Sequence, residues 1–136
     1  MLNITLISGK PGSGKTYTAR LMSLTCHPDR VLHTTYHASP KIFNFIKKNA
    51  SFYFDMIILD ECVNETKLLN KIENLIVNYN VEIDIEEKSF TKPNLHLVII
   101  SQQKLDKLNP WIMTSNNLYV NSINELVLPF IYKFSN

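Results

Sequence analysis

The three glycines of the chain lie within six consecutive residues, and their spacing is that of a phosphate-binding loop. The stretch GKPGSGKT fits the pattern G-x-x-x-x-G-K-[ST] at Gly9, Gly14, Lys15 and Thr16. In such a loop, successive backbone N–H groups surround a phosphate, because glycine lets the chain approach without a Cβ. The lysine reaches the β- and γ-phosphates of a nucleotide, and the hydroxyl is suited to Mg²⁺. The residues predicted to bind the nucleotide are Gly9, Lys10, Pro11, Gly12, Ser13, Gly14, Lys15 and Thr16.

Two consecutive carboxylates at the end of an apolar run form the second candidate site. The run is MIILDE, and it ends at Asp60 and Glu61. A carboxylate that ends a buried strand beside the glycine-loop strand can hold Mg²⁺, which is the role we predict for Asp60. Glu61 is then placed to polarise an attacking water, which predicts hydrolysis of the nucleotide. The structural alternative for this pair is a helix N-cap followed by a first-turn acid.

A third apolar run, LVIISQQ, also ends in polar side chains. Gln102 at such a strand end is predicted to contact the γ-phosphate or the water and to report on nucleotide state. Polar residues entering a loop are the alternative. No Asn-Lys-x-Asp guanine motif is present in the chain, which favours ATP over GTP.

The other titratable residues show no site pattern. We expect Asp55 to be a solvated residue at a strand boundary. The histidines and cysteines have neither metal-binding nor redox spacing, so we expect polar strand or surface positions and two reduced thiols. These residues are His33, His37, His96, Cys26 and Cys62.

The glycine loop and the carboxylates are chemically useful only if regular elements position them. Apolar patterning predicts strands at residues 3–8, 30–37, 54–61, 81–85 and 95–101. It predicts helices at 15–24, at 39–49 with Ser39 as N-cap and Pro40 in the first turn, and at 65–79. The tail, 116–134, has two strand-like runs separated by polar residues, and Pro129 makes the last run an edge strand at best. In the first helix, apolar residues at helical spacing are Ala19, Leu21, Met22 and Leu24, and the face of the third is Leu68, Leu69, Ile72, Leu75, Ile76 and Tyr79.

Strands that alternate with helices predict an α/β fold, a P-loop NTPase with a mostly parallel sheet flanked by helices. We expect one domain over residues 1–136. A hydrophobic content of 45% with 19% charged residues is ordinary for a globular protein, and the net charge of +2 does not identify a nucleic-acid binder. The apolar runs are too short to span a bilayer and no leader is visible, so we expect a cytoplasmic protein, in a host cell or associated with a virion.

Together, GKPGSGKT, MIILDE and LVIISQQ resemble the P-loop ATPases with an additional strand and a catalytic glutamate, over about residues 3–120. Within that group the chain looks most like the FtsK–HerA side, namely viral genome-packaging ATPases and the zonula-occludens-toxin-like assembly ATPases of filamentous phages. Those families also have a strand ending in Ser-Gln, here Ser101 and Gln102. The resemblance implies a ring-forming motor that moves nucleic acid, with DNA as the expected partner. It implies the roles given above for Lys15, Thr16, Asp60, Glu61 and Gln102.

The chain departs from that pattern in its arginines. Family members often carry an arginine after the glutamine strand, where this chain has PWIMTSN. A trans-acting arginine would have to be Arg20 or Arg30, and we favour Arg30 because Arg20 lies near the phosphates of its own subunit. A small lysine patch, such as Lys47 with Lys48 or Lys104 with Lys107, would contact DNA in a ring.

Three alternative functions are less favoured by the sequence. NVEIDIEEKSF before LVIIS resembles the superfamily 3 viral replication helicases, with Lys88 as a DNA-touching lysine, although that group usually ends its third motif in asparagine. A small-molecule kinase needs an arginine-rich lid, which two arginines can hardly build. A nucleotide-gated switch or assembly factor would scarcely hydrolyse ATP, and Glu61 argues against it.

Overall fold

The computed structural model describes residues 2–62, 66–79, 84–85, 88–89, 93–102 and 120–128. Its main sheet has five strands in the order β2-β3-β6-β1-β7, and each of their pairings is parallel. The strands are β1 (Leu2–Gly9), β2 (Val31–Thr35), β3 (Met56–Cys62), β6 (Leu95–Ser101) and β7 (Val120–Leu128). The predicted α/β class with a parallel sheet is confirmed.

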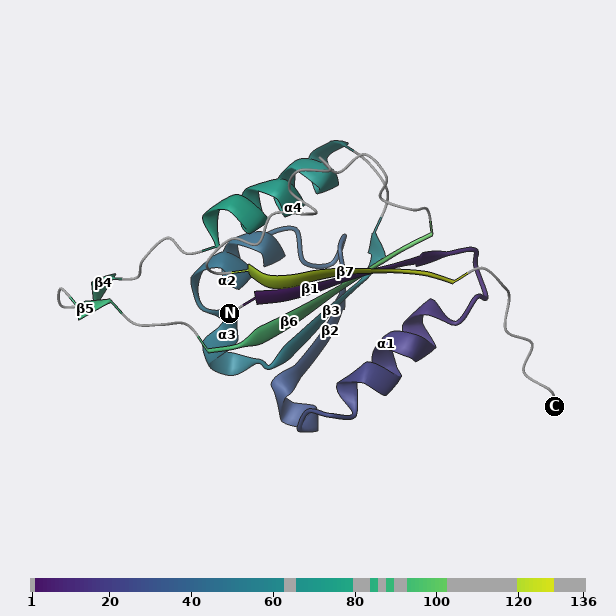
Figure 1. Cartoon of the computed structure of the whole chain (residues 1–136), viewed down its shortest axis with the longest axis horizontal. Helices are drawn as coiled ribbons and strands as arrows, with labels where there is room; N and C mark the ends of the chain where they lie inside the picture. The colour runs from purple at the N-terminus through teal and green to yellow at the C-terminus, as the bar shows by residue number, and fades with distance from the viewer. Residues whose placement is uncertain are drawn as a thin grey trace.

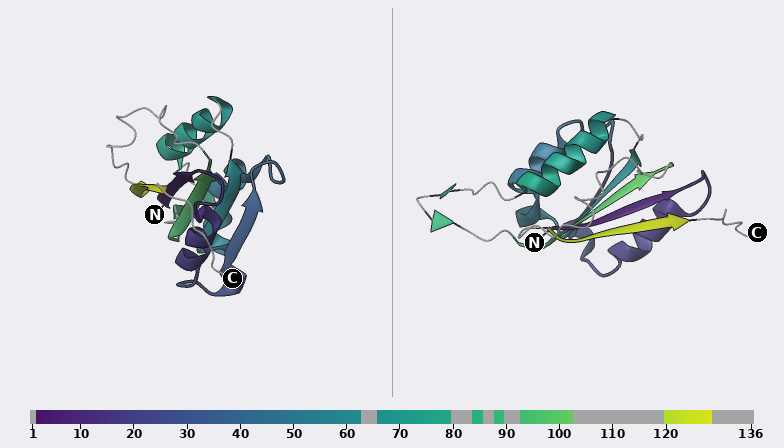
Figure 2. Two further views of the ribbon diagram at one scale, coloured as in Figure 1. Left: turned by 90° about the vertical axis from the view of Figure 1, so that its right-hand side faces the viewer. Right: turned by 45° about the horizontal axis from the view of Figure 1, so that its top comes forward.

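Helices cover both faces of the sheet, as Figure 1 and the two views of Figure 2 show. On one face lies α1 (Lys15–Ser23), and on the other lie α2 (Ile42–Lys48), α3 (Ala50–Tyr53) and α4 (Thr66–Asn78). A short 3-10 helix, η1 (Pro28–Arg30), leads into β2, and β4 (Asp84–Ile85) pairs antiparallel with β5 (Lys88–Ser89) in a separate two-stranded sheet. Within the part of the chain that the structure describes, no helix is both long enough and apolar enough to cross a membrane.

The strand order determines which chain segments meet. The prediction that the carboxylate strand β3 lies directly beside the glycine-loop strand β1 is wrong, because β6 lies between them. Ser101 of β6 is in register with Ser8 of β1 and with Cys62 of β3. Because the three strands are parallel, their carboxyl ends lie at the same edge of the sheet. The glycine loop after β1, the carboxylates at the end of β3 and the polar residues after β6 therefore meet at that edge.

Apolar side chains are divided unequally between the two faces. The face under α2, α3 and α4 has a large cluster of buried apolar side chains. Along β1, β3 and β6, alternate residues point into this cluster and into the cluster on the other face. The α1 face has a smaller cluster, whose buried members are Ile7, Ala19, Met56, Ile58, Val98 and Ile100. Of the apolar residues predicted along α1, Ala19 is buried, whereas Leu21 and Leu24 are exposed. The sheet therefore packs mainly on one side.

The predicted element bounds are largely confirmed, with three corrections. α4 buries all six predicted residues, and β6 has the predicted bounds. Ser39 is not a helix cap, because α2 begins only at Ile42 and the Ser39 hydroxyl lies 3.0 Å from that of Thr34. The four-residue helix α3 was not predicted.

The third correction concerns the C-terminal region. Val120–Leu128 forms one strand that runs through the polar residues expected to separate two runs. A sheet edge tolerates such residues, and β7 lies at the edge of the sheet next to β1. Pro129 lies outside the described residues. Of the strand predicted at 81–85, only Asp84–Ile85 is described, in the small separate sheet.

Candidate active site

The glycine loop turns sharply between β1 and α1. Gly12 has φ 79° and Gly14 has φ 89°, both in the left-handed region that favours glycine. The Ser13 N–H donates to the carbonyl of Lys10 at 3.1 Å and closes a turn within the loop. Gly14 is the N-cap of α1 and offers no side-chain cap, so the loop presents the first N–H groups of the helix at the carboxyl edge of the sheet.

Lys15 lies folded over the loop. Its Nζ donates to the carbonyl oxygens of Gly9 and Lys10, each at 2.9 Å. Burial lowers the pKa of Lys15, and the nearby Asp60 carboxylate partly opposes that shift. The structure therefore holds the ammonium at the mouth of the loop and within electrostatic range of the β3 carboxylate.

Thr16 and Asp60 meet directly, although they are 44 residues apart in the chain. The Thr16 hydroxyl donates to Oδ2 of Asp60 at 3.0 Å. The same Oδ2 lies 3.0 Å from Nε2 of His33, which is mostly buried on β2. A hydroxyl and a carboxylate are hard oxygen donors of the kind that Mg²⁺ prefers, and Mg²⁺ is usually held by such groups together with substrate phosphates. The residues present thus fit the predicted nucleotide and metal.

The contact of His33 with Asp60 was not foreseen from the sequence. The sequence predicts only a polar strand or surface position for His33. In the register of β2 and β3, Thr35 is paired with Asp60, so His33 lies two residues earlier on the same side of its strand. Only the adjacency of β2 to β3 reveals the contact, and no spacing within the sequence encodes it.

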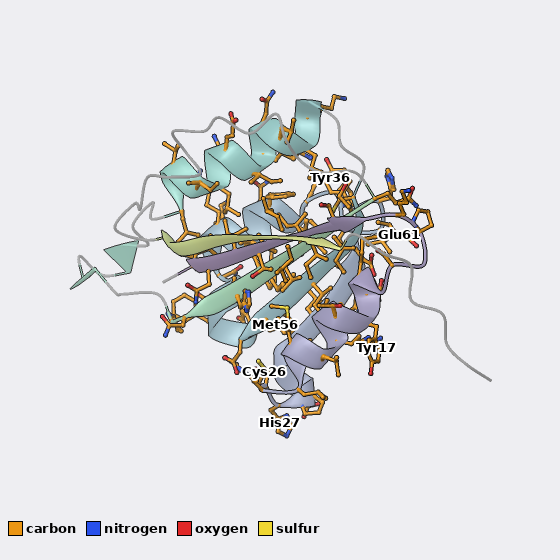
Figure 3. The ribbon with its side chains drawn as sticks, turned by 45° about the vertical axis from the view of Figure 1, so that its right-hand side comes forward. Tyr17, Cys26, His27, Tyr36, Met56 and Glu61 are labelled. Carbon is orange, nitrogen blue, oxygen red and sulfur yellow. The ribbon has the colours of Figure 1, made fainter. Side chains whose placement is uncertain are left out.

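Glu61 occupies a strained position at the end of β3. Its φ is 54°, a positive value in a non-glycine residue, and the pairing of β3 with β6 shifts register between Leu59 and Cys62. Its N–H donates to Oδ1 of Asp60 at 2.8 Å, and its side chain is exposed. Figure 3 shows Glu61 at the loop end of the sheet. Strained backbone of this kind costs on the order of 1–3 kcal/mol and is concentrated at functional sites.

The alternative of a helix N-cap at the two carboxylates is wrong. β3 continues through both of them to Cys62, and α4 begins at Thr66. Burial raises the pKa of the Cys62 thiol to about 12, with a further contribution from the Asp60 carboxylate. Cys62 is therefore a protonated, free thiol at neutral pH and no nucleophile.

Gln102 lies at the same edge of the sheet as the loop. It directly follows β6, and its side chain is exposed, whereas Ser101 before it is buried. Its proximity to the loop follows from the position of β6 between β1 and β3. The role of Gln102 toward phosphate or water stays a prediction.

Arg30 and Asp55 form an ion pair at the amino ends of β2 and β3, away from the glycine loop. Nη2 of Arg30 lies 3.0 Å from Oδ1 of Asp55, and Nη1 donates to the carbonyl of Phe52 at 3.2 Å. Asp55 is therefore not merely a solvated boundary residue, because it holds the start of β2 beside that of β3. The guanidinium is engaged within its own chain, which argues against Arg30 as the trans-acting arginine.

Comparison with known proteins gives a likeness in fold. No family model matches the chain, and no curated protein matches it. Among solved structures, the chain is similar to one in the structure of Drosophila ORC bound to DNA, with a TM-score of 0.50 and 15% sequence identity. The match covers 93% of this chain but 37% of that chain, so this chain spans little more than a third of its length. At this identity the likeness concerns the fold alone.

Proposed function

We propose that this chain is an ATPase that hydrolyses ATP with Mg²⁺ at the glycine loop. The observation that carries the proposal is the convergence of Lys15 and Thr16, at the start of α1, with Asp60, which lies 44 residues from Thr16 in the chain. The P-loop NTPase fold suggested by the motifs is supported by the strand order and by the similarity to the Drosophila ORC chain.

Each residue has a defined task in this proposal. The loop amides and Lys15 hold the phosphates, where the ammonium exchanges the carbonyls of Gly9 and Lys10 for phosphate oxygens. Thr16 and Asp60 would hold Mg²⁺, which would supply positive charge beside the phosphates. Glu61 orients the attacking water and accepts its proton.

The geometry at Glu61 favours hydrolysis over a switch that merely binds nucleotide. A β-bulge and a positive φ turn this residue out of the regular strand pattern beside Asp60. A carboxylate used only for solubility needs no such strain. A switch or assembly factor with little hydrolysis is therefore the less favoured function.

We further propose that hydrolysis is coupled to nucleic acid, in a homo-oligomeric ring that moves DNA. The resemblance of the motifs to genome-packaging and phage-assembly ATPases supports this. The chain of similar fold comes from a structure of Drosophila ORC bound to DNA. A superfamily 3-type helicase is the second candidate. The lysine that would contact DNA in such a helicase, Lys88, lies on β5. Lys104 and Lys107, one of the lysine patches predicted to contact DNA in the ring, lie outside the described residues.

The first test compares two lysines of the same loop. Lys15→Ala removes the ammonium that faces the phosphates, and we expect calorimetry to show no ATP·Mg²⁺ binding at concentrations that saturate the wild type. Lys10→Ala removes the same charge at an unspecified position of the motif, where only the backbone is predicted to contact the phosphates, and should retain binding. Equal affinities for the wild type and Lys15→Ala would refute the assignment of the site.

A second experiment tests the coupling to DNA. ATP turnover is measured with and without single- and double-stranded DNA, alongside light scattering for the molecular mass. We expect turnover to rise with protein concentration and with DNA, and the stimulation to fall steeply as salt increases. A strict monomer whose turnover ignores DNA at low salt would refute the motor while leaving the ATPase intact.

A further inference from the structure

A cleft with both polar and apolar lining lies between α2 and α4, on the face of the sheet away from α1. It has a volume of about 340 Å³. Figure 1 shows the two helices over the same face of the sheet. Lysines and asparagines from both helices line it together with apolar side chains, and none of its described lining residues is acidic. The polar lining residues are Asn44, Lys47, Asn70, Lys71 and Asn74.

Lysines outnumber acidic residues on these two helices. They carry four lysines, at positions 47, 48, 67 and 71, against one acid, Glu73, which gives 4 − 1 = +3. The whole chain carries +2, so the remaining residues together carry −1. The cleft thus lies between two helices with a net positive charge, which is an electrostatic feature expected of a surface that binds phosphate.

The structure holds Lys71 in place at the cleft. Its Nζ donates to the hydroxyl of Tyr36 at 3.3 Å and lies 5.3 Å from the centroid of the same ring. Tyr36 is itself buried and packs edge-to-face against Phe43, which lines the cleft. An ammonium held by a hydroxyl and an aromatic face loses less side-chain entropy on binding an anion than a solvated lysine does.

The size and chemistry of the lining fit one nucleotide unit. A volume near 340 Å³ is at the lower end of small-molecule sites and too small for a folded partner segment. Lysines suit the phosphate, asparagine amides suit the edge of a base, and the apolar side chains of Phe43 and Leu75 can support a sugar or base. We propose that the α2–α4 cleft binds a single nucleic-acid strand through one of its nucleotides. This inference rests on the proposed function for its choice of nucleic acid as the partner.

A single residue, Tyr36, connects the cleft to the candidate active site. Tyr36, which holds Lys71 through its hydroxyl, donates its backbone N–H to the carbonyl of Asp60 at 3.0 Å. A strand bound in the cleft would therefore contact Lys71, whose hydrogen-bond partner Tyr36 is hydrogen-bonded through its backbone to the predicted Mg²⁺ ligand. This contact provides a physical route between the strand and the nucleotide site.

The test measures binding of a labelled single-stranded oligonucleotide to the full chain by fluorescence anisotropy, at low salt and without ATP. Lys47→Gln and Lys71→Gln should each weaken binding about tenfold, on the order of one charge-assisted contact, and reduce the salt dependence by about one unit. Asn74→Ala should weaken binding without changing the salt dependence. Lys67→Gln is the matched control for Lys71→Gln, because it removes the same charge from the same helix at an exposed residue that does not line the cleft. It should change affinity less than about twofold, as an exposed charge does.

Three results would contradict binding at the cleft: a loss of affinity in Lys67→Gln equal to that in Lys71→Gln, unchanged binding in Lys71→Gln, or no binding of the oligonucleotide by the wild type. Displacement of the strand by polyglutamate at an equal concentration of charged groups would also contradict it, because the cleft would then bind any polyanion. Urea midpoints of all variants exclude misfolding as the cause. Because ATP is absent from this assay, strand binding at the cleft can be confirmed even if the ATPase assignment is wrong. It can also be refuted while Lys15→Ala still abolishes ATP binding.

Discussion

The two faces of the sheet differ in how much they bury and in what they position. The face under α2, α3 and α4 has the large apolar cluster, in which Leu68, Ile72 and Leu75 of α4 are almost fully buried. On the other face, α1 contacts the sheet through Ala19 and the partly buried Met22, while Leu21 and Leu24 point to solvent. Yet α1 is the helix that begins with Lys15 and Thr16.

This difference separates stability from nucleotide binding. Burial of apolar side chains is the dominant favourable term in folding, so the α4 face supplies most of the stability. The α1 face is thin, and it holds the helix whose first turn faces the phosphates. A change on the α4 face should therefore unfold the chain without altering the site, whereas a change under α1 should alter both.

The largest effect on stability is expected from Ile72→Ala. Ile72 is fully buried on the α4 face, and removing a large buried side chain there costs about 2–5 kcal/mol of unfolding free energy. Urea denaturation measures this loss, and the ATP affinity of the folded fraction should be unchanged. Leu24→Ser, at a residue 77% exposed on α1, serves as the control and should stay within about 0.5 kcal/mol of the wild type. Similar losses of unfolding free energy in the two variants would contradict the claim that the α4 face supplies most of the stability.

A smaller loss of stability, coupled to a loss of ATP binding, is expected from Ala19→Leu. Ala19 is fully buried where α1 meets the sheet, so a larger side chain would displace the helix at a cost of about 1–3 kcal/mol. Because the displaced helix carries Lys15 and Thr16, ATP affinity should fall about tenfold, as measured by calorimetry on the folded protein. Unchanged affinity in a destabilised Ala19→Leu would show that the loop is positioned independently of α1 packing.

The smallest effect concerns a polar pair at the other end of the same thin face. Nε2 of His96 lies 2.7 Å from Oγ1 of the buried Thr5, and burial lowers the pKa of His96. The unfolded chain therefore takes up a proton near pH 6.5, where folded His96 resists it, and stability falls as the pH drops below about 6.5 toward the folded pKa. His96→Gln, which still offers Thr5 a hydrogen bond, should make the urea midpoint less dependent on pH between neutral and mildly acidic conditions. His37→Gln, at an exposed residue after β2, should keep the dependence of the wild type.

The sequence predicts the parts of this molecule that local pattern determines. The glycine spacing, the apolar runs of β3 and β6 and the periodicity of α4 are each read within one segment, and each is found in the structure. The pattern of α1 indicated a helix but not how little of it is buried. Periodicity shows where apolar residues lie on a helix, while their burial depends on the partner surface.

The features that were not predicted arise between segments. The contact of His33 with Asp60 depends on β2 lying next to β3, and the pair of Arg30 with Asp55 depends on where those strands begin. The positive φ of Glu61 results from a bulge in the pairing of β3 with β6, and no residue type marks it in advance. The continuous strand β7 forms because β1 offers it an unpaired edge, which outweighs the polar residues in its middle.

The most direct test of the ATPase assignment is Glu61→Gln, which separates binding from chemistry. The substitution keeps the size of the side chain and removes the base, while the loop, Lys15 and the contact of Thr16 with Asp60 remain. We predict that Glu61→Gln binds ATP·Mg²⁺ with the affinity of the wild type and hydrolyses it about 10²- to 10⁴-fold more slowly. Wild-type turnover in Glu61→Gln would contradict the account, because the catalytic base would then lie elsewhere.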